Sequence, residues 1–182
     1  FMAQKKETVD EALAGDVVGL PDTGNFKIGD TLTSGEKLHF KGLPSFSPEM
    51  LKYIDNADPM KQKQLDKGVN QLMDEGVAQL FISQLNGRKI IGTVGQLQFE
   101  VIQYRLEHEY QAKCKWQPLQ MYKACWIESD DDAELDMFKK RKAQYMAYDK
   151  EGRDVFMADS AYVLNMAQQD YKHIQFHFTS EF

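Results

Sequence analysis

The chain has 182 residues, of which 42% are hydrophobic and 27% are charged, and its formal net charge is −6 at pH 7. This composition is close to that of soluble globular proteins. The length is sufficient for one ordinary domain or two small ones. The acidic balance argues against a general nucleic-acid coat, which is usually basic, but it is compatible with a local basic face that contacts RNA. The longest apolar run is far shorter than the ~20 residues of a membrane span, and the N-terminal stretch lacks the apolar region of a signal peptide.

Residues 1–43 are rich in turn-forming pairs that contain glycine, which tolerates the positive φ of tight turns. Short apolar runs lie between these pairs, at Val17-Val18, Phe26–Ile28 and Leu38–Phe40. The spacing predicts short strands joined by tight turns, as part of an antiparallel β-barrel that is too short to close by itself. Because this pattern has no natural beginning, we expect the chain to be a truncated piece of a longer protein.

Residues 44–118 alternate between helical and strand-like periodicity. The predicted elements, in chain order, are an extended segment at 38–47, a helix that starts at Asp58-Pro59 and ends at Gly76, strands at 77–85 and 89–94, a helix at 97–110, and a strand at 112–116 that Pro118 ends. Proline suits the first helical position, and Asn86-Gly87 between two extended runs is a strong hairpin signal. The order β-α-β-β-α-β predicts a ferredoxin-like domain with both helices on one face of a four-stranded antiparallel sheet.

The two predicted helices of this segment have apolar residues at helical spacing. In the first helix these are Leu65, Val69, Leu72 and Met73, and in the second they are Leu97, Val101, Ile102, Leu106 and Tyr110. We expect each set to form one core-facing side of its helix.

Residues 119–182 predict a further α/β unit that packs with the preceding one, so that 44–182 form one continuous domain. The expected elements are strands at 122–127 and 154–158, helices at 130–145 and 162–169, and an edge strand at 174–178. Asp130, Asp131 and Asp132 suit the N-terminus of the first of these helices, where the helix dipole favours carboxylates. No internal repeat is evident in the sequence. The fold class is therefore α+β, with a partial β-barrel followed by a ferredoxin-like domain and a C-terminal α/β extension.

Large aromatic residues, histidines and cysteines all have ordinary structural interpretations. The aromatic side chains expected in the core are Phe81, Phe99, Trp116, Trp126 and Phe138. The histidines His39, His108, His173 and His177 do not have the spacing of a zinc site, and Cys114 and Cys125 form no CxxC pair. We expect no metal site and two unpaired thiols, as is usual in a reducing cytosol.

Three stretches of the chain resemble known families. The residues Ala14–Leu20 and Ile28–Leu32 look like the end of the β-barrel second domain of translational GTPases. The segments Phe46–Glu49, Asp58–Leu65 and Gly92–Val101, together with Leu164-Asn165, Ala167-Gln168, Tyr171 and Gln175-Phe176, are similar to peptide chain release factor 3. The resemblance covers essentially the whole chain.

This resemblance implies a cytoplasmic translational GTPase whose C-terminal region docks on the ribosome. The family promotes the departure of class I release factors after peptide release, and its N-terminal domain holds GTP and Mg²⁺. The resemblance therefore implies three partners: the small ribosomal subunit through its proteins and rRNA, the class I release factors indirectly, and the missing GTPase domain, which holds the nucleotide. No membrane partner is implied.

The residues themselves predict no nucleotide site and no catalytic residues in this chain. A phosphate-binding loop needs G-x-x-x-x-G-K-[ST], in which glycine backbone N–H groups and the lysine hold the phosphates. The nearest match, Gly24–Thr31, has Asp30 where lysine must stand, and a carboxylate repels phosphate. Asp149–Gly152 fits a loose D-x-x-G pattern, which we interpret as an ordinary turn. We expect the chain to bind no GTP and to have no cofactor of its own.

Basic residues are the candidates for ribosome or RNA contact, because phosphate contacts set affinity without reading sequence. They lie on the first helix, at the hairpin tip and near the end of the third helix: Lys61, Lys63 and Lys67; Arg88 and Lys89; and Lys139, Lys140, Arg141 and Lys142. The competing interpretation is a solvated surface, in which Asp and Glu at helical spacing neutralise the cations.

Two alternative functions remain open from the sequence. The first is another translational GTPase of the elongation or ribosome-protection type, although the chain ends too soon for the further ferredoxin-like domain of those proteins. The second is a small ferredoxin-like phosphohydrolase that uses a loop arginine and a strand asparagine. Here Arg88 and Asn86 share one hairpin, and no phosphate-binding loop follows the first strand.

Overall fold

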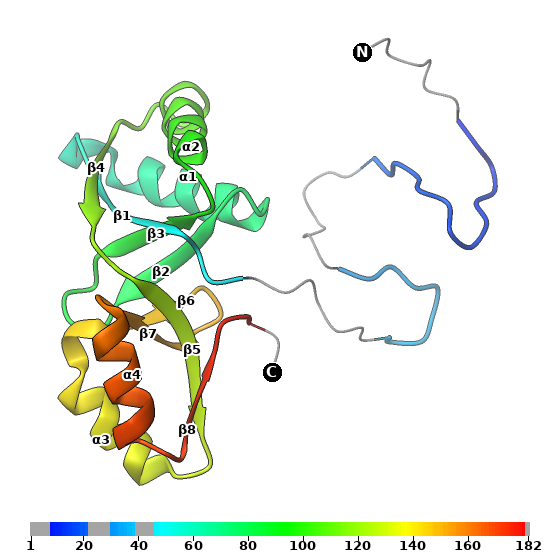
Figure 1. The fold of residues 1–182 in the computed structure, drawn as a ribbon. Helices are drawn as coiled ribbons and strands as arrows, with labels where there is room; N and C mark the ends of the chain where they lie inside the picture. Colours follow the sequence, from blue (N-terminus) through cyan, green and yellow to red (C-terminus); the bar gives the residue numbers. More distant parts are fainter. Residues whose placement is uncertain (1–7, 22–29, 39–45, 181–182) are drawn as a thin grey trace.

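The computed structural model describes residues 8–21, 30–38 and 46–180 (Figure 1). In the first two of these ranges the backbone forms no helix or strand, so the strand predicted at Val17-Val18 is wrong for this chain. Val17 is fully exposed. A strand needs a neighbour for its backbone hydrogen bonds, and no described residue pairs with this one. The run Phe26–Ile28 and residues 39–40 lie outside the described residues.

The first half of the folded body has the predicted split β-α-β-β-α-β order. Its elements are β1 (Met50–Asn56), the 3₁₀ turn η1 (Pro59–Lys61), α1 (Gln62–Asp74), β2 (Gln79–Ser83), β3 (Lys89–Thr93), α2 (Gln96–Glu109) and β4 (Cys114–Leu119). The strands are antiparallel in the order β4-β1-β3-β2, and α1 and α2 pack on one face of them. The ferredoxin-like prediction for this half is confirmed.

Local sequence signals place the boundaries of these elements. The Asp58 carboxylate accepts a hydrogen bond from the Met60 backbone N–H at 3.0 Å, which caps the turn that leads into α1. At the hairpin tip, Gly87 has φ = 69°, the left-handed conformation that glycine adopts without strain. Its N–H donates to the Ser83 carbonyl oxygen at 2.8 Å. The predicted helix start and hairpin are therefore confirmed.

The helices of the first half approach closely at a glycine. A Cβ atom on Gly68 would lie 2.7 Å from Leu106 and 2.8 Å from the ring of Tyr110. The two helices can therefore touch here only because Gly68 has no side chain. This close contact places the buried faces of both helices in one core. The core-facing set predicted for α1 is buried as expected, namely Leu65, Val69, Leu72 and Met73.

Two predictions about the strands of the first half are wrong. The first strand is Met50–Asn56 rather than the extended segment at 38–47, of which residues 39–45 lie outside the described part of the chain. Pro118 does not end the last strand, because β4 continues to Leu119. β4 is an edge strand, and proline is tolerated there because one side of an edge strand needs no N–H donor.

The second half repeats the topology of the first. Its elements are β5 (Lys123–Ser129), α3 (Asp132–Arg141), the turn η2 (Ala143–Tyr145), β6 (Met146–Asp149), β7 (Asp154–Ala158), α4 (Ala161–Asp170) and β8 (Ile174–His177). The strands run β6-β7-β5-β8, which is the order of the first half read from the opposite edge. The expectation of no internal repeat is therefore wrong at the level of structure. It failed because no strand was predicted at residues 146–149, which form β6. The predicted helix at 130–145 was also too long, since α3 ends at Arg141 and η2 follows it.

Several predictions for the second half, and most of those for the aromatic core of both halves, are confirmed. Asp131 accepts hydrogen bonds from the backbone N–H groups of Ala133 and Glu134, both at 3.0 Å, and so caps α3. Asp149–Gly152 forms the turn between β6 and β7, and β8 is an edge strand. The predicted aromatic core residues Phe81, Phe99, Trp126 and Phe138 are buried, and Trp116 is half-buried against Phe99.

The two halves share one eight-stranded antiparallel sheet, because β2 pairs with β6. Each helix pair covers its own half, and Figure 1 shows the two pairs at separate ends of the sheet. A third core lies on the faces of the sheet that the helices do not cover, and both halves contribute to it. Its buried residues are Leu51, Phe81 and Ile90 from the first half and Ala124, Trp126, Ala147, Val155 and Met157 from the second. The halves therefore depend on each other for burial.

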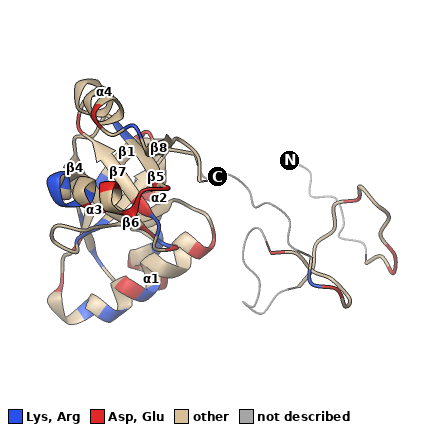
Figure 2. Cartoon of the chain, turned by 90° about the horizontal axis from the view of Figure 1, so that it is seen from below, with Lys and Arg blue, Asp and Glu red and all other residues tan. Residues whose placement is uncertain are grey.

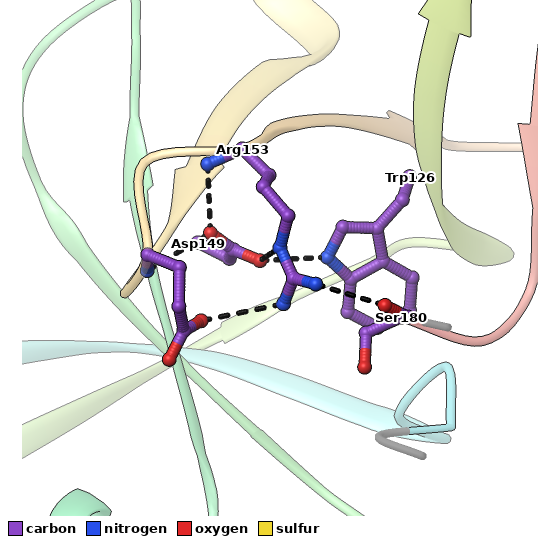
Figure 3. Close-up of polar contacts among 5 residues, drawn as sticks. Trp126, Asp149, Arg153 and Ser180 are labelled. Carbon is purple, nitrogen blue, oxygen red and sulfur yellow. Dashed lines mark hydrogen bonds and ion pairs between the residues drawn. The ribbon is translucent and has the colours of Figure 1, made fainter. Parts of the chain in front are cut away.

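The ends of the body are joined to one another. Phe46 forms a β-bridge with Thr179, and the Ser47 N–H donates to the Phe178 carbonyl oxygen at 2.9 Å. Arg153 donates to the Ser180 carbonyl oxygen at 2.8 Å (Figure 3). The chain thus enters and leaves the body side by side. No helix in the described ranges is long and apolar enough to cross a membrane.

Candidate functional site

Two predicted lysines lie unpaired on the outer face of α1. Lys63 and Lys67 are one turn apart, opposite the buried face, and both are exposed. Neither makes an ion pair or a side-chain hydrogen bond with the described residues. Lys61, in the preceding turn, is half-buried and equally without a partner there. Figure 2 shows basic and acidic residues along this helix.

The carboxylates of α1 do not neutralise these lysines. Asp66 is 2.5 Å from the Lys89 ammonium, and Asp74 pairs with Lys150 from the β6–β7 turn. The solvated-surface interpretation expected Asp and Glu at helical spacing to compensate the cations. Here both acidic side chains of the helix pair with lysines from other elements, so Lys63 and Lys67 remain available for an external anion.

The hairpin residues Arg88 and Lys89 point back onto the body. The Arg88 guanidinium lies 2.7 Å from an Asp55 carboxylate oxygen and 2.6 Å from the Gln117 amide oxygen. Its Cζ atom is 3.9 Å from the centre of the Tyr53 ring, in a cation–π contact. Because Lys89 is paired with Asp66, both predicted cations of this hairpin already have internal partners.

A polar pocket of about 290 Å³ lies beside this hairpin, between the end of β1 and the start of α1. Its lining includes the Arg88–Asp55 and Lys89–Asp66 pairs. Two cations and two carboxylates cancel in charge, so the pocket offers an anionic ligand no net attraction.

The end of α3 carries the third predicted group. Lys139 lies 2.9 Å from an Asp154 carboxylate oxygen, and this hydrogen bond raises the pKa of the lysine. Lys140 and Arg141 are exposed and Lys142 is half-exposed, and none of the three has a side-chain partner among the residues described. Cations at a helix C-terminus are also stabilised by the helix dipole. The structure thus leaves two separate sets of unpaired cations, one on α1 and one at the end of α3.

Reactive groups are few in the described chain. Cys114 and Cys125 are unpaired and buried, and burial raises the pKa of their thiols to about 11 and about 12. Both therefore remain protonated and unreactive at neutral pH. The Asn86 side chain accepts a hydrogen bond from the Arg88 N–H at 3.0 Å, as a turn residue does. Within residues 8–21, 30–38 and 46–180, no three His, Cys, Asp or Glu side chains gather as metal ligands; His39 lies outside these ranges.

One surface was missed from the sequence. Leu97 and Val101 were expected in the core, but both are exposed on the outer face of α2, together with Tyr104. The signal was present in the spacing. The predicted apolar set of this helix was too wide for one side, because a helix turns 100° per residue and Leu97 lies opposite Leu106.

Comparison with known protein families covers nearly all of the chain. A family model described as class II release factor RF3, C-terminal domain, matches residues 40–168. This range includes every described helix and strand except β8 and the last two residues of α4. A second model, elongation factor G domain 2, matches residues 1–35. The two matches follow one another along the chain in the order expected from the sequence, and they confirm both the barrel-domain assignment of the N-terminal segment and the family of the folded body.

Proposed function

Because the chain belongs to the class II release factor RF3 family through its C-terminal domain, we propose that it is a ribosome-binding region. The whole factor would be GTP-dependent and would promote the dissociation of class I release factors during translation termination. The observation that carries this proposal is the match over residues 40–168, because the matched model describes the C-terminal domain of this one family of translation factors.

The surface of the body supports ribosome binding by simple electrostatics. Lys63, Lys67, Lys140 and Arg141 are exposed and have no internal partner in the described chain. Unpaired cations on rigid helices can replace counterions at rRNA phosphates, which favours binding without sequence readout. These contacts would operate despite the net charge of −6, since the field near a surface depends on local charges.

The proposed mechanism is a shift between ribosome conformations. The body would dock on the small subunit and act as a lever for a GTPase domain, which would bind GTP and Mg²⁺ outside these 182 residues. The GTP-bound factor would favour a ribosome conformation that holds class I release factors less tightly. The chain itself would bind no nucleotide, because Asp30 stands at the lysine position of its nearest phosphate-loop match. Its compartment would be the cytoplasm, where ribosomes work.

Replacing Lys63 and Lys67 together with glutamine tests the α1 contact. We expect the affinity for purified small ribosomal subunits to fall roughly 10- to 100-fold at low salt, as two charge-assisted contacts disappear. The slope of log affinity against log salt should become less steep by about 2, since about one unit is lost per phosphate contact. Co-sedimentation over a salt series measures both quantities.

A matched control separates this local effect from net charge. The double variant Asn165→Glu/Gln168→Glu changes the net charge by the same amount on exposed positions of α4. Its affinity and salt slope should stay near those of the wild type. Equal losses in the two double variants would show that only overall charge matters, and the assignment of Lys63 and Lys67 as contacts would then be wrong.

The alternative functions have less support. The elongation factor G domain 2 match covers only residues 1–35, whereas the match over the body, residues 40–168, is to release factor RF3. A ferredoxin-like phosphohydrolase would need a guanidinium free to hold phosphate, but Arg88 is engaged by Asp55, Gln117 and Tyr53.

A further inference from the structure

An apolar stripe runs along the outer face of α2 and is not covered by any described residue. Leu97, Val101 and Tyr104 are 73%, 50% and 62% exposed, and Val94, just before the helix, is 69% exposed. The His108 ring stacks on the Tyr104 ring with their centroids 3.9 Å apart, which extends the stripe by one turn. Positions 97, 101, 104 and 108 follow the i, i+4, i+7, i+11 spacing of a single line along a helix.

The stripe lies opposite the side of α2 that forms the core. Phe99, Ile102 and Leu106 are buried on that side, where they pack with α1 and the sheet. α2 is therefore apolar on two opposite faces. A helix with this distribution is typically covered on both sides, whereas a surface helix has a polar outer face.

Carboxylates without a cation partner border the stripe on one flank. Glu100 is exposed and makes no ion pair or side-chain hydrogen bond with any described residue. Glu107 accepts only a 3.4 Å hydrogen bond from the Gln103 amide. A ligand that covers the apolar side chains would therefore meet unneutralised negative charge beside them.

Among the described residues, the other flank carries one arginine that carboxylates neutralise and one lysine that none neutralises. Arg105 donates to Glu75 at 2.5 Å and to Glu109 at 2.7 Å, so two carboxylates already share its charge. Lys52, near the start of the helix, donates to the Gln96 amide oxygen at 2.9 Å and lies 4.3 Å from the centre of the Phe99 ring. The surface around the stripe is acidic on balance.

We propose that this stripe, formed by Leu97, Val101, Tyr104 and His108, is the docking site of a basic amphipathic polypeptide segment of the ribosome. Apolar side chains of that segment cover the stripe, and its lysines or arginines pair with Glu100 and Glu107. This inference rests on the proposed function, since the ribosome supplies the partner.

The charge pattern distinguishes this partner from two others. An RNA would place phosphates against Glu100 and Glu107, and the like charges would repel. A second copy of the chain, packed helix to helix, would bring the same acidic flank against itself. The first half of the body therefore divides its contacts, with Lys63 and Lys67 of α1 facing phosphate and α2 facing protein.

The double variant Leu97→Glu/Val101→Glu tests the stripe directly. The full 182-residue chain is titrated with a synthetic amphipathic helix of leucine and lysine, and backbone NMR signals are followed. Saturable shifts should map to α2, and the double variant should bind at least about 10-fold more weakly, the loss that buried anchor residues cause in interfaces. The control variant Tyr162→Glu/Asn165→Glu, on exposed positions of α4, should bind like the wild type. Shifts that avoid α2, or equal affinity of both double variants, overturn the proposal.

A second measurement identifies the partner on purified small ribosomal subunits. A photoreactive benzoylphenylalanine at position 104 should form an adduct with a lysine- and arginine-rich ribosomal protein, identified by mass spectrometry. An adduct with rRNA, a covalent dimer of the chain, or no adduct despite subunit binding overturns the proposal. If the wild-type chain does not bind subunits at all, the proposed function fails, and the peptide titration still decides the stripe.

Discussion

Asp149→Ala is expected to lower the free energy of unfolding by about 2–4 kcal/mol, because it removes a buried carboxylate that accepts charged hydrogen bonds and leaves a buried donor without a partner. The Asp149 carboxylate accepts from the Trp126 indole N–H at 2.8 Å and from Arg153 Nε at 2.7 Å (Figure 3). It also accepts from the backbone N–H groups of Glu151 and Arg153 at 3.0 and 2.8 Å. Alanine leaves the buried Trp126 N–H without a partner and removes the bonds that shape the β6–β7 turn.

Urea unfolding, followed by tryptophan fluorescence, measures this loss. Glu151→Ala is the matched control in the same turn, because the Glu151 side chain is exposed and reaches Arg153 only at 3.3 Å. We expect the control to change stability by less than about 1 kcal/mol, as exposed ion pairs contribute little. Equal effects of the two variants would mean that the buried carboxylate is not a stabilising centre.

Phe138→Ala is expected to cost about 3–5 kcal/mol, as a cavity forms in the core of the second half. Phe138 is fully buried, and its ring meets the rings of Phe156, Tyr171 and Phe176 edge-on at centroid distances of 5.1, 4.8 and 5.9 Å. Truncation removes all three aromatic contacts at once, in addition to the buried area.

The same variant tests whether the halves unfold together. Because β2 pairs with β6 and the third core draws on both halves, Phe138→Ala should shift one cooperative transition without splitting it. Thermal unfolding followed by far-UV circular dichroism and by calorimetry should give the same midpoint. Met137→Ala, at the neighbouring exposed position, should leave that midpoint nearly unchanged. Two separate transitions would show that the repeat consists of independent units.

Short-range signals predicted the parts of the fold that depend on local chemistry. Asn86-Gly87 identified a hairpin because few residue pairs adopt the required backbone conformation, and Asp58-Pro59 identified a helix start for a similar reason. The split β-α-β-β-α-β order of the first half followed from these markers. None of them needed knowledge of a distant residue.

The errors occurred where burial depends on distant partners. β6 has only four residues, and β1 includes Lys52 and Asp55 beside apolar residues. Neither strand therefore has a clear period-2 pattern of apolar residues. Their strand conformation is fixed by pairing with β3 and β4, and with β2 and β7, respectively. Because the sequence did not indicate a strand at β6, it did not reveal that the second half repeats the topology of the first.

The candidate contact residues show the same limit. Arg88 pairs with Asp55, 33 positions away, and Lys139 pairs with Asp154. No pattern in the sequence predicts either pair. By contrast, the exposure of Lys63 and Lys67 follows from their position opposite Leu65 and Val69 on α1. Whether the unpaired cations bind the ribosome stays a prediction.

Equilibrium binding of the 182-residue chain to purified ribosomes, with and without GTP, tests the central proposal most directly. We predict saturable binding whose affinity falls with added salt and is the same in the presence and absence of the nucleotide. The salt dependence follows from the phosphate contacts, and the nucleotide independence follows from the lack of a phosphate-binding loop. Absence of saturable binding, or binding that requires GTP, would contradict the proposal.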